Sequence, residues 1–153
     1  MKKSEFERLV DKAFFELETR HGLKKTDTAF HKHGCVVRFQ NTTTQVTLNY
    51  EITSLPWMEI ADISDLEHNK STLEWLLVEK GIEKSPTPDL AFQTTKMAGS
   101  QLEATLQMKC QQLLEHGAPL LNGDFSIIPK LQDRARKYGL ACERYAKIHK
   151  LKK

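Results

Sequence analysis

The spacing of apolar residues changes partway along the chain, and this change is the strongest constraint on its fold. Between Phe6 and Leu17 apolar side chains recur every three or four residues, which is typical of an amphipathic helix. Between Cys35 and Ile52 apolar and polar residues alternate instead, as they do in half-buried strands. A chain that uses both periods in turn is predicted to have an α+β fold.

The alternating region predicts an antiparallel meander. Two runs, 35–40 and 46–52, are joined by the polar residues 41–44 and form a hairpin, and residues 57–63 after Pro56 predict a third strand. We therefore expect a three- to four-stranded antiparallel meander packed against an N-terminal helix and a C-terminal pair of long helices. One side of the sheet is apolar, and the other carries the polar residues Arg38, Thr47, Asn49 and Glu51.

Capping residues predict where two of the helices begin and end. Ser4 is placed to cap the first helix and Gly22 to end it. Ser71 and Glu74 have the spacing of a capping box, which predicts a short helix that stops at Gly81.

The stretch LLNGDFSIIPKL, residues 120–131, predicts a corner between two helices. A long helix is expected from Ser100 to about Leu121, with a kink or break near Pro119. Gly123 suits the left-handed position after a helix end, Ser126 is placed to cap the next helix, and Pro129 falls in its first turn. We interpret Gly123 and the adjoining aspartate as a structural hinge rather than a catalytic loop.

Length and composition predict one soluble domain. A chain of 153 residues has room for a single core, so one domain over 1–153 is expected, with a basic C-terminal tail from about residue 147. No run reaches the roughly 18 apolar residues of a membrane span, and the start lacks the apolar core of a secretory signal. Three cysteines at wide spacing favour a reducing compartment, so we expect a cytoplasmic protein without a membrane association.

The residue patterns that carry chemistry are weak. His31, His33 and Cys35 alternate and supply three possible zinc ligands, but structural zinc uses four and no second pair is present. We expect a buried thiol beside two loop histidines, and whether the three ever bind a metal stays open. Glycines are dispersed, and no Gly-x-Ser-x-Gly motif occurs. We therefore expect no cofactor and no enzyme activity.

The charges are distributed unevenly along the chain. The net charge is +3, yet residues 130–153 contain nine basic and two acidic residues. Residues 51–83 contain eight acidic and two basic residues. Such a separation indicates surfaces that recognise a partner by charge.

The order of the predicted elements, together with LLNGDFSIIPKL, resembles small bacterial immunity proteins, the antidotes to polymorphic or contact-dependent toxins. The resemblance covers about residues 6–145. It implies a cytosolic protein that neutralises a cognate toxin by tight binding, without chemistry of its own. Immunity proteins against nucleases are commonly acidic, whereas this chain is slightly basic.

Two surfaces are candidates for such a partner, and other functions remain open. Trp is enriched among interface hot spots, so Trp57 is the expected anchor of the acidic surface unless it belongs to the core. A nucleic-acid-associated protein that uses the basic C-terminal helix is the first alternative, although the aromatics of that helix are on its core side. A small enzyme of unknown class is the second, and the oligomeric state is left open. The acidic surface comprises Glu51, Trp57, Glu59, Asp62 and Asp65, and the basic surface comprises Arg136, Lys137, Arg144 and Lys147.

Overall fold

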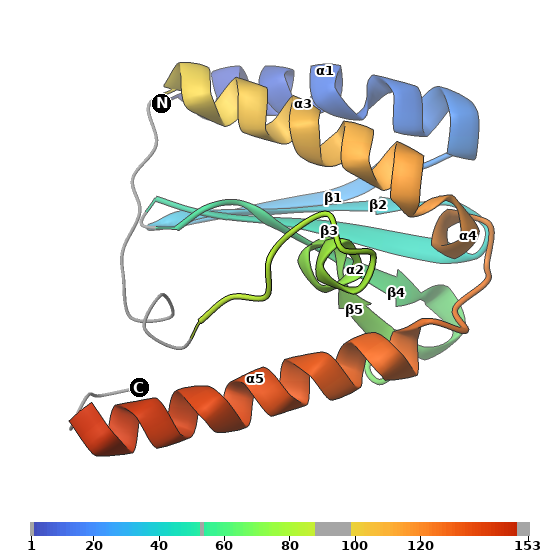
Figure 1. Cartoon of the computed structure of the whole chain (residues 1–153). Helices are drawn as coiled ribbons and strands as arrows, with labels where there is room; N and C mark the ends of the chain where they lie inside the picture. The colour runs from blue at the N-terminus through green and yellow to red at the C-terminus, as the bar shows by residue number, and fades with distance from the viewer. Residues whose placement is uncertain (1, 53, 88–98, 150–153) are drawn as a thin grey trace.

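Five strands form one antiparallel sheet in which each strand pairs with the next along the chain. The computed structural model describes residues 2–52, 54–87 and 99–149. Figure 1 shows α1 and α3 side by side over one face of the sheet and α5 on the opposite side. The elements are α1 (Lys3–His21), β1 (Lys24–His31), β2 (Gly34–Gln40), β3 (Thr44–Glu51), β4 (Trp57–Asp62), η1 (Ile63–Asp65), β5 (Lys70–Thr72), α2 (Leu73–Glu79), α3 (Gly99–His116), α4 (Ala118–Leu121) and α5 (Ile128–His149).

The predicted α+β class and meander are confirmed, and two further strands extend the sheet. β1 lies at one edge and pairs with β2, and the three-residue β5 lies at the other edge and pairs with β4. Within the described residues, every helix is too short or too polar to span a lipid bilayer.

The main core lies between the sheet and the pair α1 and α3. Cys35, Val37 and Phe39 are buried on the sheet face that α1 covers, as their alternation predicts. The Phe14 ring of α1 stacks parallel to that of Phe39, with the ring centroids 3.9 Å apart. α3 adds its own buried stripe, which consists of Leu102, Leu106, Cys110 and Leu113.

The opposite face of the sheet is polar, as predicted. Arg38 donates to Asp27 across β1 and β2 at 2.6 Å. The Gln40 amide donates to that of Gln45 across β2 and β3 at 2.7 Å. Thr47 also lies on this face, but it is buried, with only 7% of its surface exposed.

The predicted N-caps of α1 and α2 are wrong. α1 begins at Lys3, one residue before Ser4, and its N-cap residue Lys2 makes no side-chain capping bond. α2 is capped by Thr72 rather than Ser71, because the Thr72 hydroxyl accepts from the Trp75 amide at 3.2 Å. The predicted stop at Gly22 is confirmed by its left-handed φ of 68°.

The predicted break and corner of the C-terminal helices are confirmed. α3 ends at His116, and Pro119 falls in the first turn of the separate α4. Gly123 has φ 92°, a conformation that favours glycine. The prediction that Ser126 caps the next helix is wrong. Its amide and its hydroxyl both donate hydrogen bonds to Asp124 instead. These two hydrogen bonds lower the pKa of Asp124.

Asn41 joins the β2–β3 turn to the ends of two helices. Its Nδ2 donates to the carbonyl oxygens of His21 and Leu121, each at 2.9 Å. Its Oδ1 accepts from the amides of Thr43 at 3.0 Å and Thr44 at 2.8 Å. One side chain therefore holds the turn, the end of α1 and the end of α4 together.

We expect Asn41→Ala to lower the free energy of unfolding by about 2 kcal/mol, because several partly buried groups lose their partner at once. Urea unfolding followed by circular dichroism measures the change. Asn122→Ala is the control, since Asn122 is exposed and the structure shows no side-chain bond for it among the described residues. A loss for Asn41→Ala no larger than that of the control would contradict the role assigned to Asn41.

Candidate binding site at the turn end of the sheet

The predicted acidic surface is divided between the two ends of the sheet. Glu51 ends β3 and Trp57 begins β4, so both lie at one end. Asp62 ends β4, five strand residues away from Trp57, which corresponds to about 17 Å. Asp65 follows in η1 at that far end, and Glu59 lies between. The five residues therefore do not form one patch.

Three of these acids have local structural partners. Glu59 lies 3.8 Å from the Lys70 ammonium group. Asp62 accepts from the hydroxyl and amide of Ser64, and these bonds hold its pKa below the usual range. Asp65 lies 3.1 Å from the His68 ring nitrogen. These contacts brace the segment between β4 and β5.

Trp57 belongs partly to the sheet and partly to the surface. It is half-buried and pairs with Asn49 of β3. Because its neighbour Met58 is fully buried in the core, Trp57 points to the opposite face of the sheet, away from α1.

The basic surface on α5 is partly neutralised within the helix. Arg136 and Lys137 both pair with Asp133, at 2.6 and 2.9 Å. Arg144 and Lys147 are exposed further along α5, and the part of the chain that the structure describes shows no ion pair for either. The predicted tail begins inside this helix, which continues to residue 149, and the rest of the tail lies outside the described residues.

A small cavity lies at the end of the sheet where β1 turns into β2 and where α1 begins. Both of these segments are on the left in Figure 1. We call it the turn-end pocket, and its volume is about 220 Å³. It has an aromatic floor of Phe6, Phe30 and Tyr50 and a basic rim of Lys2, Lys3, His31, Lys32 and His33.

The aromatic floor comes from three different elements. Phe6 of α1 stacks on Tyr50 of β3, with centroids 5.1 Å apart. The same Phe6 ring meets Phe30 of β1 edge to face, with centroids 6.3 Å apart. Phe6 is buried, whereas Phe30 and Tyr50 are half-buried and so present ring surface to the cavity.

The basic rim combines the first residues of α1 with the turn between β1 and β2. Lys3 places its ammonium group 5.1 Å from the centroid of the Phe30 ring. Lys32 and His33 form the two-residue turn itself. Among the described residues, no ion pair is shown for Lys2, Lys3 or Lys32. The rim therefore carries uncompensated positive charge over an apolar floor.

Cys35 lies under this pocket as the buried thiol that the alternation predicts. Burial, with a smaller contribution from the charge of Glu7, raises the pKa of the Cys35 thiol to about 11. The thiol is therefore protonated near neutral pH, whereas metal ligation and nucleophilic attack require the thiolate. His31 ends β1 and His33 lies in the turn, and both are exposed. Among the described residues, no three His, Cys, Asp or Glu side chains gather as metal ligands.

Two exposed apolar side chains lie on the connection between β3 and β4. Ile52 lines the pocket and is 55% exposed, and Leu55, three residues further on, is 50% exposed. The Ile52 amide donates to the His33 carbonyl at 2.8 Å, which holds this connection against the β1–β2 turn. We refer to the turn-end pocket with Ile52 and Leu55 as the turn-end surface.

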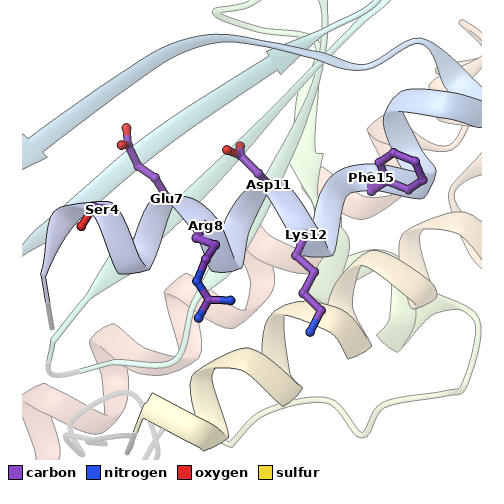
Figure 2. Close-up of a pocket in the computed structure, with 6 residues that line it drawn as sticks. All are labelled: Ser4, Glu7, Arg8, Asp11, Lys12 and Phe15. Atoms are coloured by element: carbon purple, nitrogen blue, oxygen red, sulfur yellow. The ribbon is translucent and has the colours of Figure 1, made fainter.

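A second depression runs along the outward face of α1. Figure 2 shows Glu7 and Asp11 on one side of the helix, Arg8 and Lys12 on the other, and Phe15 at the far end. Asp11 pairs with Lys25 of β1 at 2.9 Å, and Lys12 pairs with Glu103 of α3 at 3.0 Å. These ion pairs fasten α1 to its neighbours, and the depression is wide open. It is therefore a poorer candidate than the turn-end pocket.

Comparison with known proteins adds no further information. No family model, no curated protein and no solved structure matches this chain.

Proposed function

We propose that this protein neutralises a bacterial toxin in the cytoplasm by binding it, without catalysis, and that the toxin docks on the turn-end surface. The proposal joins the resemblance in element order to one observation. That observation is the gathering of exposed Ile52 and Leu55, half-buried aromatic rings and unpaired cations at one end of the sheet.

This combination suits a protein interface. Apolar side chains at the centre and polar groups at the rim are the usual anatomy of such surfaces. The basic rim would meet an acidic region of the toxin, which speeds encounter and selects the partner. Glu51 and Trp57 of the predicted surface lie at this same end of the sheet, so they border the proposed interface.

Co-expression in a bacterial host tests the proposal. The proposal requires that a gene adjoining that of this chain encodes the toxin, and induction of that gene alone should stop growth. We expect the wild-type chain to restore growth and the double variant Ile52→Asp and Leu55→Asp to fail. The purified double variant should bind the toxin about 100-fold or more weakly, because two interface anchors lose their apolar contact.

A matched control separates the interface from general damage. Met108→Asp and Ile82→Asp change side chains of similar exposure, 50% and 45%, elsewhere on the surface. This control variant should restore growth like the wild type. Growth restored equally by the Ile52 and Leu55 variant would place the interface elsewhere, and a wild-type chain that neither restores growth nor binds would refute the proposed function.

A further inference from the structure

The three lysines of the turn-end pocket are gathered around one cavity. Lys2, Lys3 and Lys32 have no ion pair within the described residues and line one small cavity. Like charges held together in this way repel one another, and a bound anion relieves the repulsion. Lysines with a carboxylate partner are Lys12, Lys25, Lys70, Lys109, Lys130 and Lys137.

The volume of the pocket indicates the size of the chemical group that carries the anion. A volume of about 220 Å³ is smaller than the roughly 300–1,000 Å³ of sites for drug-sized ligands. It exceeds the roughly 150 Å³ that holds one benzene ring. The pocket therefore suits one apolar side chain together with a small anionic group.

Carboxylates near the pocket do not cancel its charge. Glu7 acts on the Cys35 thiol but faces the outward depression on α1. Glu51 pairs with Gly34 in the ladder of β2 and β3 and is exposed. The three lysines line the pocket, whereas Glu7, Glu51 and Glu5 of the first turn of α1 lie outside its lining. The first turn of α1 lacks a side-chain cap, and the Glu5 carboxylate in that turn offsets part of the positive potential of its free amides.

We propose that the turn-end pocket binds the C-terminal residue of a partner polypeptide. The terminal carboxylate and the side chain branch from the same Cα atom, so the carboxylate can meet the lysines of the rim while an apolar side chain lies on Phe30 and Tyr50. An internal aspartate or glutamate can bring its carboxylate to the lysines, but it has no separate apolar side chain to lie on the rings. The identification of this partner as the toxin rests on the proposed function. The preference of the pocket for a C-terminal residue does not depend on it.

A small probe tests the pocket without any toxin. N-acetyl-L-phenylalanine reproduces a C-terminal aromatic residue, and binding is followed by nuclear magnetic resonance of the full-length chain. We expect saturable shifts at His31, His33 and Gly34. The neutral amide of the same compound should bind about tenfold more weakly, because it loses the charge-assisted hydrogen bonds. The α-amide of N-acetyl-glutamate, which carries only a side-chain carboxylate, should also bind about tenfold more weakly.

Charge reversal at the rim supplies the second measurement. Lys3→Glu with Lys32→Glu should weaken binding of the probe about tenfold or more. Lys24→Glu with Lys80→Glu is the control, because it changes the net charge equally at exposed lysines away from the pocket, and it should leave binding nearly unchanged. Equal binding of acid and amide, stronger binding of the glutamate derivative, or equal loss in both variants would each overturn the assignment. None of these results bears on growth rescue, so the two proposals fail separately.

Discussion

Gly34→Ala is expected to lower the free energy of unfolding by about 3 kcal/mol. A Cβ at this position would lie 1.9 Å from the Tyr50 carbonyl oxygen and 2.9 Å from the Glu51 Cα. Both are backbone atoms of β3, so no side-chain rotation relieves the overlap. The start of β2 must move away from β3, which breaks the Gly34–Glu51 pair and disturbs the adjoining bond from Ile52 to His33.

Thermal and urea unfolding measure this loss, and a second glycine provides the control. For a chain of this length we expect the melting temperature to fall by about 10 °C. Gly139→Ala should instead stabilise the protein by about 0.5–1 kcal/mol, because Gly139 lies within α5 and a Cβ there meets nothing within 4 Å. A Gly34→Ala protein as stable as the wild type would mean that β2 and β3 are further apart than the structure shows.

The same substitution connects the fold to the pocket. Gly34 and Tyr50 both line the turn-end pocket, so a displaced β2 changes its floor. Gly34 is the residue after the Lys32–His33 turn, and its lack of a side chain allows the turn to lie close to β3. Within the stretch HKHGC, Gly34 therefore determines how close the turn with Lys32 and His33 lies to β3.

The fold class was predictable because it depends on local periodicity, and the missed strands lack that signal. β2 alternates fully buried and half-buried residues, and β3 follows the same alternation over 44–49 except at Thr47, so the apolar side of both strands is visible in the sequence. β1, with the sequence KKTDTAFH, is exposed at most positions because it is an edge strand. β5 contains only three residues, all half-buried. Both strands are stabilised by pairing with a neighbour rather than by an apolar side of their own.

The candidate site was harder to predict because it depends on a long-range contact. The spacing of His31 and His33 suggests metal ligands, and nothing in the first residues of the chain indicates that they lie beside these histidines. The stacking of Phe6 on Tyr50 brings the two segments together, and neither segment alone indicates a pocket. Exposed charges along β4 were predicted as a surface, yet Asp62 and Asp65 are used in local turns.

Glu74 shows why a correct local motif produced a wrong structural prediction. The spacing of Ser71 and Glu74 is that of a capping box, but the Glu74 side chain turns to tertiary partners. Its Oε1 accepts from the Met58 amide of β4 at 3.2 Å, and its Oε2 accepts from Lys109 of α3 at 2.7 Å. Lys109 is largely buried, with 11% of its side chain exposed. The Glu74 carboxylate is therefore the partner of the buried Lys109 ammonium group and of the Met58 amide, which β5 is too short to reach.

We expect Glu74→Ala to lower the free energy of unfolding by about 3 kcal/mol, because it leaves the Lys109 charge and the Met58 amide without a partner in a largely buried site. The double variant Glu74→Gln with Lys109→Met should recover most of this loss. Glutamine still accepts from Met58, and methionine fills the space of the lysine stem without a charge.

A double-mutant cycle distinguishes a coupled pair from two independent contributions. The four proteins of the cycle are the wild type, Glu74→Gln, Lys109→Met and the double variant, each measured by urea unfolding. Glu74→Gln alone should be more destabilising than the double variant, because it leaves the Lys109 ammonium group facing a neutral amide. If the losses in unfolding free energy of the two single variants add up to that of the double variant, the ion pair does not hold α2, α3 and β4 together. If they do not add, Glu74 and Lys109 act as a coupled pair that links α2 to β4 and to α3.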